Sequence, residues 1–171
     1  MLEQPGLVPD HLSHGLKIIF VGFNPSLRSG ETGHHFANPS NRFWRILYEA
    51  GLTSRIYKPE EDHLLLRLGY GLTNIVPRPT RAASDIMPEE YLRGRQLLYQ
   101  KLRNYHPGTV CYVGKGVYQA YSQRKQAPWG YQSSDMIDGV RDFVAPSSSG
   151  LVRMKTPEIA AIYRQLNELL A

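Results

Sequence analysis

Residues 16–26 have the sequence LKIIFVGFNPS, and this stretch decides the fold class. Its first seven residues are almost continuously apolar, are rich in β-branched side chains and end in Gly22. This pattern is typical of a strand that is buried on both faces. Polar residues and glycines follow, so we expect a loop that runs to about residue 40.

The same alternation of elements continues along the chain. Apolar runs predict three further strands, and apolar residues at three- and four-residue spacing predict helices between them. Strands that alternate with helices are typical of an α/β fold. We therefore predict one three-layer α/β/α domain over residues 1–171, with an irregular lead-in at residues 1–14 and a mainly parallel, four-stranded central sheet. The predicted strands cover residues 16–22, 71–76, 109–114 and 142–146, and the predicted helices cover residues 41–50, 59–68, 88–105 and 115–123 and a segment that begins at Pro157.

Composition narrows the class of protein. The chain has 171 residues, of which 42% are hydrophobic and 20% are charged, as in an ordinary globular protein. No apolar run approaches the roughly 20 residues of a membrane helix, and the N-terminus lacks the pattern of a signal peptide. We therefore expect a cytoplasmic protein without membrane association. The net charge of +5 favours polyanionic partners such as nucleic acid.

The cysteine and histidine content argues against a metal centre. Cys111 is the single cysteine, so the chain can form neither an intramolecular disulfide nor a Cys-rich zinc or iron–sulfur site. It lies in the apolar run TVCYVG, and we expect it to be buried in the core. His34 and His35 are adjacent, and the side chains of adjacent residues usually point apart. Without further ligands, this pair does not predict a metal site.

Three polar loops follow predicted strands, with the sequences GFNPS, PRPT and APSSSG. Ligands of open α/β sheets bind at the carboxyl ends of the strands, so we expect these loops to converge on one site. In the first loop, Pro25 restricts Asn24 to an extended conformation and thereby fixes where its amide points. That amide can hold a water molecule, or it can close an Asx turn that stabilises the loop.

Two further loops offer side chains for a nucleic-acid site. Phe36 lies among Gly, Ser, His and Asn residues, where its ring can either stack on a flat base or tuck into the core. Residues 145–154, APSSSGLVRM, offer small hydroxyls and backbone amides that suit phosphate contacts. Leu151 could enter a base stack as a wedge and Arg153 could bind a phosphate, unless this segment is a solvated loop before a helix. The GKG sequence at residues 114–116 lacks the Walker spacing and predicts a strand-to-helix turn.

Five segments occur in an order that is specific to one family. They are GFNPS, TGHHFANPSNRFW, LTNIVPRPT, GKGVY and APSSSG. Over residues 16–170 the chain resembles the mismatch-specific uracil/thymine DNA glycosylases of the uracil-DNA glycosylase superfamily, and the resemblance implies the fold of that superfamily. Ser26 stands where the family's first motif has glycine, and we expect it to stiffen the loop or narrow the pocket.

The resemblance implies roles for individual residues. Asn24 would position the attacking water, and Phe36 would stack on a base that has been flipped out of the duplex. The backbone amides of Phe23 and Phe36 would contact the base carbonyls, and Ser29 would form part of the pocket wall. The wedge that fills the gap left by the flipped base would comprise Ser147, Ser148, Ser149, Gly150, Leu151 and Arg153.

Two polar residues near the second predicted strand are further candidates. Asp85 matches a position that is often acidic in the family, where it would assist catalysis by orienting water or stabilising positive charge. It can equally be a cap or turn residue before the helix that begins near Pro88. Asn74 lies at a strand end and is expected to be a polar residue of the base pocket.

The resemblance implies hydrolysis of the N-glycosidic bond of uracil in duplex DNA, with thymine or other damaged pyrimidines as further candidate substrates. We expect a G·U mismatch to be preferred because mispaired bases flip at the lowest cost. We expect base excision repair by a monomer that uses no metal and no organic cofactor. The first alternative is a glycosylase of the same fold for another base, such as xanthine, hypoxanthine or ethenocytosine. The second is a non-catalytic protein that binds mismatches or lesions.

Overall fold

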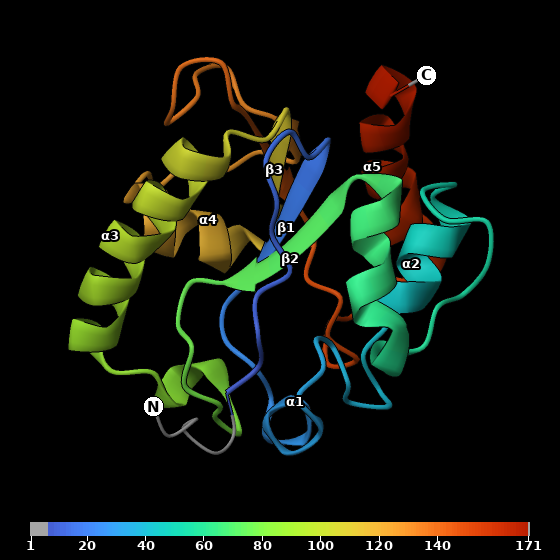
Figure 1. Cartoon of the computed structure of the whole chain (residues 1–171), viewed down its shortest axis with the longest axis horizontal. Coiled ribbons are helices and arrows are strands. Elements are labelled where there is room, and N and C mark those ends of the chain that lie inside the picture. The colour runs from blue at the N-terminus through green and yellow to red at the C-terminus, as the bar shows by residue number, and fades with distance from the viewer. Residues whose placement is uncertain (1–6, 171) are drawn as a thin grey trace.

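The computed structural model describes residues 7–170, with the backbone alone at Leu169. Residues 1–6 of the expected lead-in lie outside the described part of the chain. The centre of the structure is a five-stranded sheet with the strand order β2-β1-β3-β5-β4 (Figure 1). The strands are β1 (Ile18–Gly22), β2 (Tyr70–Asn74), β3 (Thr109–Val113), β4 (Gly130–Tyr131) and β5 (Arg141–Ala145). The four longer strands run parallel to one another.

The expectation of four strands is corrected by β4, a fifth strand that pairs antiparallel with the end of β5. It has only two residues, and one of them, Gly130, has a backbone φ of 94° that lies in the left-handed region. A strand this short produces no alternation of apolar and polar residues, so no sequence pattern marks it. The remaining strands fall where the apolar runs predicted them, within one or two residues at either end.

The helices are α1 (Leu27–Thr32), α2 (Phe43–Glu49), α3 (Pro88–Tyr105), α4 (Lys115–Ser122) and α5 (Thr156–Leu170), with 3₁₀ segments η1 (Pro59–Leu68) and η2 (Ala83–Asp85). The polar, glycine-rich sequence that follows β1 predicted a loop where α1 lies. Six residues with Leu27 as the single large apolar side chain cannot display helical periodicity, but Ser26 caps α1 by accepting a hydrogen bond of 3.0 Å from the backbone N–H of Ser29.

Helices cover both faces of the sheet, which gives the predicted three layers (Figure 1). One core cluster packs α2, α5 and η1 against one face, and it includes Phe20, Phe43 and Tyr163. The other cluster packs α3 and α4 against the opposite face, and it includes Val21 and Tyr112. Alternate residues of β1 point to opposite clusters because successive strand side chains alternate in direction. Cys111 is fully buried in the first cluster, as predicted.

The topology places a natural binding site beyond β1. The chain passes from β1 to β2 on one side and then crosses to β3 on the other side of β1. In parallel sheets, such a reversal leaves a crevice at the carboxyl ends of the strands. At the outer edge of the sheet, His11 forms an isolated antiparallel bridge with Leu72 of β2. Within residues 7–170, none of the helices has the length and apolar character of a membrane span.

Candidate active site

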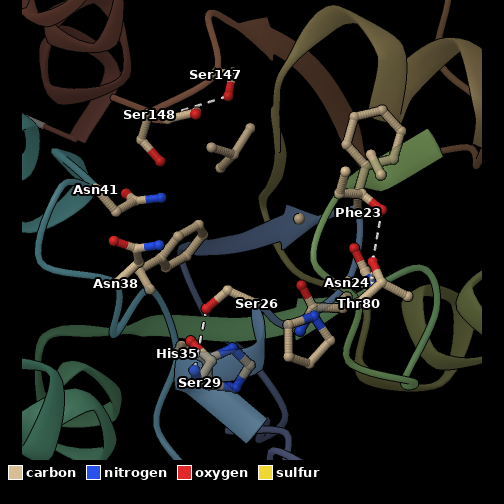
Figure 2. A pocket seen from close by; sticks show the side chains of 18 of the residues that line it. Phe23, Asn24, Ser26, Ser29, His35, Asn38, Asn41, Thr80, Ser147 and Ser148 are labelled. Carbon is tan, nitrogen blue, oxygen red and sulfur yellow. Dashed lines mark hydrogen bonds between the residues drawn. The ribbon is translucent and has the colours of Figure 1, made fainter. Parts of the chain in front are cut away.

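A cavity of about 340 Å³ lies at the carboxyl end of β1. The loops that the sequence analysis expected to converge do line it, as Figure 2 shows for the side chains of eighteen lining residues. The lining includes nearly all the residues predicted for the site, namely Phe23, Asn24, Ser29, Phe36, Asn74, Ser147, Ser148, Ser149, Gly150 and Leu151. Asp85 and Arg153 are not among the lining residues.

The amide of Asn24 is held in one orientation. Its Nδ2 donates two hydrogen bonds of 2.8 Å, one to the carbonyl oxygen of Arg78 and one to the hydroxyl of Thr80. Asn24 and Thr80 lie side by side in the cavity wall (Figure 2). A carbonyl can only accept, so the contact with Arg78 identifies Nδ2 as the donor side of the amide. Within the described chain, Oδ1 of Asn24 has no hydrogen-bond partner and remains available to accept a hydrogen bond from a water or a ligand.

The loop that contains Arg78 and Thr80, the two acceptors of the Asn24 amide, is itself held in place by further contacts. The Thr80 hydroxyl donates to the carbonyl of Ala82 at 2.7 Å, which leaves its lone pair for Asn24. Arg78 forms a two-pronged ion pair with Glu90 of α3, with N–O distances of 2.9 and 2.8 Å. The hydrogen bond from Arg78 holds the pKa of the Glu90 carboxyl down, at about 2. Arg78, whose backbone carbonyl orients Asn24, is therefore tied to the start of α3 by its side chain.

Phe36 forms an aromatic wall of the cavity under backbone strain. Its φ is +50°, which is uncommon for a residue with a side chain and costs about 1–3 kcal/mol. One face of its ring stacks on Phe43, with centroids 4.0 Å apart and an interplanar angle of 16°. Its carbonyl accepts a hydrogen bond of 3.2 Å from the indole N–H of Trp44. These contacts hold a flat apolar surface at the edge of a polar cavity.

Several polar groups of the cavity are free to bind a ligand. The backbone N–H groups of Phe23 and Phe36 have no hydrogen-bond partner within residues 7–170. The side-chain amide of Asn74 also has no hydrogen-bond partner within residues 7–170. Its Oδ1 lies close to Gly22, only 2.7 Å from the position that a Cβ at residue 22 would occupy. Glycine at position 22 is therefore required for the approach of Asn74.

The aromatic ring of Phe23 packs against α4 and is not one of the groups that are free to bind a ligand. A Cβ on Gly116 would stand 2.6 Å from the tip of the ring, so Phe23 packs tightly against the start of α4. The GKG sequence forms the expected strand-to-helix turn, with Gly114 immediately before α4. Gly116, in the first turn of α4, leaves room for the ring of Phe23. Only the backbone amide of Phe23 remains available to a ligand in the cavity.

Ser29 connects the first loop to the segment that carries Phe36. Its side chain is 2% exposed, and its hydroxyl oxygen accepts a hydrogen bond of 3.0 Å from the backbone N–H of Ala37. Ser26, which caps the same short helix, also lines the cavity (Figure 2). The backbone φ of −67° at position 26 places no demand for glycine, and the Ser26 hydroxyl fixes the start of α1 by its hydrogen bond to Ser29.

The loop of residues 147–153, which we call the wedge loop, forms the opposite rim. Leu151 is 95% exposed, whereas Ser148 is 1% exposed and faces the cavity. A Cβ on Gly150 would stand 2.6 Å from the carbonyl oxygen of Ser40, so only glycine allows this close approach. The wedge loop thus rests on residues 38–41 and projects one large apolar side chain into solvent.

Arg42 supports the backbone of the wedge loop by hydrogen bonds, a role that was not predicted from the sequence. Its guanidinium donates to the carbonyl oxygens of Ser149, Val152 and Met154 at 2.9, 3.1 and 2.9 Å. Its backbone N–H also donates to the carbonyl of Ser148 at 2.9 Å. The acceptors lie more than one hundred residues away in the sequence, and no local signal indicates them.

Asp85 and Arg153 lie apart from the cavity lining. The Asp85 carboxylate accepts a hydrogen bond of 3.1 Å from the backbone N–H of Ala82 and thereby caps η2. Its backbone carbonyl accepts a hydrogen bond of 3.0 Å from Arg78. This arrangement matches the cap or turn that the sequence allowed for Asp85. Arg153 is exposed on the wedge loop.

Residues 38–41 contribute two amides that the sequence analysis did not single out. Asn38 and Asn41 lie across the cavity from Asn24 and Thr80 (Figure 2). Asn38 accepts from the backbone and hydroxyl of Ser40, and Asn41 accepts from the backbone N–H of Phe43. The sequence NPSN in this loop, rich in Asn and Ser, is the signal that could have indicated such turns.

Fold and site together define an α/β protein with an aromatic-walled polar cavity at the switch point of its sheet. Residues 9–171 match the family model described as the uracil DNA glycosylase superfamily. Since this match spans nearly the whole sequence, the chain belongs to that superfamily. The structure is similar to the solution NMR structure of a candidate uracil DNA glycosylase from Methanosarcina acetivorans, with a TM-score of 0.62, 20% identity, and coverage of 95% of this chain and 98% of that one. That likeness shows the fold.

Proposed function

We propose that this protein is a monofunctional glycosylase that flips uracil out of duplex DNA and hydrolyses its N-glycosidic bond, with uracil opposite guanine preferred. The observation that carries the proposal is the fixed amide of Asn24, whose two N–H bonds are used and whose Oδ1 is free. Membership of the superfamily supports a DNA glycosylase. The net charge of +5 suits a DNA partner.

In the proposed reaction, Oδ1 of Asn24 accepts a hydrogen bond from the attacking water. The oxygen lone pair of that water is then directed at the anomeric carbon of the flipped nucleotide. An amide cannot take up a proton at neutral pH, so Asn24 orients the water without acting as a general base. The reaction therefore depends on a sugar that is already strongly cationic, with the DNA phosphates as nearby negative charges.

The departing base gains negative charge, and the cavity supplies donors for it. The unpaired backbone N–H groups of Phe23 and Phe36 would stabilise the uracil anion as an oxyanion hole does, by fixed dipoles in a site that excludes water. The ring of Phe36 would stack on the base, and the free amide of Asn74 would bind its polar edge. Each of these groups is held in place before the substrate arrives.

The wedge loop would fill the space that the flipped nucleotide leaves. Leu151 is almost fully exposed, as a side chain that enters a base stack must be. The serines before it and Arg153 would contact phosphates. Because flipping costs least at a mismatch, uracil opposite guanine is the natural substrate. The proposed enzyme acts as a monomer on DNA in the cytoplasm, and the reaction consumes only water.

The first measurement is single-turnover excision on labelled duplexes that contain U opposite G, U opposite A or T opposite G. We expect the wild-type protein to cleave G·U fastest. Asn24→Ala should lower the rate by about 100-fold or more, the scale of the loss when a reacting group is misplaced, while DNA binding is largely retained. An equal loss of binding and excision would contradict the role of Asn24.

Two results would favour other activities. If wild-type protein cleaves none of these duplexes but releases xanthine, hypoxanthine or ethenocytosine, the cavity is specific for another base. If it binds mismatched DNA and releases no base at all, the protein is a mismatch or lesion binder. If Asn24→Ala remains active, Asp85→Ala is the next variant to measure.

A further inference from the structure

Asp62 is a buried carboxylate surrounded by imidazole rings. Its side chain is 1% exposed, and its Oδ1 lies 3.3 Å from Nε2 of His11 and 3.2 Å from Nδ1 of His34. Its Oδ2 accepts a hydrogen bond of 2.9 Å from the backbone N–H of His35. These contacts join three segments that are distant in sequence, namely the N-terminal segment, the loop that carries Phe36, and η1.

The charge of this carboxylate is poorly compensated. Its Oδ2 accepts a backbone N–H and its Oδ1 faces two imidazole nitrogens, an arrangement that suits an ionised carboxylate. In the described part of the chain, only histidines form ion-pair contacts with Asp62, and no lysine or arginine does. A buried anion in this setting is a favourable place for a cation.

His35 is held in a form that can bind a metal. The residue is only 3% exposed, so its ring lies in the protein interior. Its Nε2 lies 2.9 Å from the carbonyl oxygen of Pro9, which can only accept, so Nε2 carries the proton and Nδ1 the lone pair. Histidines that bind metals usually donate their other ring N–H to a carbonyl or carboxylate in this way.

His11 adds an unpaired nitrogen to the cluster. Its Nε2 is shielded from solvent and has no hydrogen-bond partner within residues 7–170, because the contact with Asp62 lacks hydrogen-bond geometry. The backbone of His11 is fixed by its two hydrogen bonds to Leu72 of β2, each 2.9 Å long. A buried imidazole nitrogen without a partner costs stability unless a ligand completes it.

We propose that His11, His35 and Asp62 form a binding site for a divalent transition-metal ion, with zinc as the expected occupant. One ligand atom from each residue lies within 4.8 Å of the others. Tetrahedral ligands at about 2.0–2.2 Å from zinc stand closer together than this limit, so small side-chain movements would suffice. Imidazole and carboxylate are ligands that zinc accepts, and three of them leave a fourth position for water.

This site goes beyond the proposed glycosylase activity and does not depend on it. The sequence analysis predicted no metal at His34 and His35 because further ligands were missing, and the fold supplies them from residues 11 and 62. The ion would fasten the N-terminal segment to the loop that leads into Phe36. Its effect would be on the stability of that cavity wall, because His35 itself lines the cavity and directly precedes Phe36 (Figure 2).

The test is metal titration of the untagged full-length protein after treatment with EDTA. Zn²⁺ binding is measured by calorimetry, and Co²⁺ binding by the visible absorption that tetrahedral coordination produces. The variants are His11→Asn, in which one ligand is lost at the chain's surface, and His35→Asn. The matched control is His14→Asn, because His14 is exposed, lies three residues from His11 and packs its ring on Tyr105. Circular dichroism verifies that each variant is folded.

We expect one Zn²⁺ per chain and a rise in the Tm of the wild-type protein on Zn²⁺ addition. His11→Asn should weaken binding by more than the roughly 10–100-fold that loss of an outer-shell partner causes, and His14→Asn should bind like wild type. The proposal is overturned if wild type binds neither ion. It is equally overturned if folded His11→Asn keeps wild-type affinity, or if His14→Asn loses as much.

Discussion

The two rims of the cavity are held in different ways. On the side of β1, hydrogen bonds fix the side chains that face the ligand, as the two bonds from Nδ2 of Asn24 do. On the side of the wedge loop, Arg42 and Gly150 fix the backbone, while Leu151 is left 95% exposed. One rim therefore presents a fixed functional group, and the other presents an exposed side chain on a fixed support.

This difference in how the two rims are held agrees with the function that we propose for each of them. Chemistry at the anomeric carbon needs groups within a fraction of an ångström of their working positions, because reorganisation at the moment of reaction is costly. A wedge that enters the base stack needs a free apolar side chain, and its support needs to stay in place while the DNA is pushed apart. Variants of each rim should therefore fail in different ways.

Arg42→Ala should have the largest effect of the three changes below. It leaves the carbonyls of Ser149, Val152 and Met154 without their charged donor, and a hydrogen bond to a charged group contributes about 1.5–3 kcal/mol. We expect at least that loss in the free energy of unfolding, measured by urea denaturation. Excision from G·U duplexes should fall by about 100-fold, equivalent to about 2.7 kcal/mol.

Arg42→Lys is the matched control for this variant. An ammonium group keeps the charge but lacks the planar fork that reaches three carbonyls, so recovery should be partial. Uracil in single-stranded DNA needs no wedge, so excision from it should be less affected than excision from duplexes. If Arg42→Ala slows both substrates equally while Asn24→Ala does the same, the two rims do not have separate roles.

Leu151→Ala tests the free side chain of the wedge loop. The side chain makes few contacts in the protein, so the Tm should stay within experimental error of the wild-type value. Loss of apolar surface in the base stack should slow G·U excision by about tenfold and single-strand excision hardly at all. Single-turnover rates on both substrates measure this. Leu92→Ala is the control, because Leu92 is 55% exposed on α3, away from the cavity.

A uniform loss on duplex and single-stranded substrates would contradict the wedge role of Leu151. So would a change as large in Leu92→Ala, since that would reflect a general effect of removing exposed leucine.

How far the sequence predicted each rim depends on the distance between interacting residues. Asn24 and Pro25 are neighbours, so their joint restraint could be inferred locally, and the strand before them could be predicted from its apolar run. The acceptors of the Asn24 amide lie 54 and 56 residues away. The PRPT loop that contains them was recognised as part of the site, but the contact itself needs the sheet order.

The support of the wedge loop could not be predicted at all. Arg42 lies before α2 and its acceptors follow β5, with 107 to 112 residues between the partners in the sequence. An arginine at the start of a helix is ordinarily a solvated residue, and nothing in its neighbourhood indicates a buried role. The metal-binding cluster is of the same kind, since His11 and Asp62 come together only through the edge of the sheet.

Thr80→Val tests the anchoring of the other rim and should have the smallest effect. Valine matches the shape of threonine but removes the hydroxyl that accepts from Asn24 and donates to Ala82. The amide keeps its bond to the Arg78 carbonyl, so its orientation becomes looser without being lost. We expect about a fivefold lower single-turnover rate on duplex and single-stranded uracil alike, as the loss of one neutral hydrogen bond predicts. Thr80→Ser, which keeps the hydroxyl, should restore the rate. If Thr80→Val slows only duplex excision, the two rims would be coupled, and Thr80 would act through the wedge loop and not through Asn24.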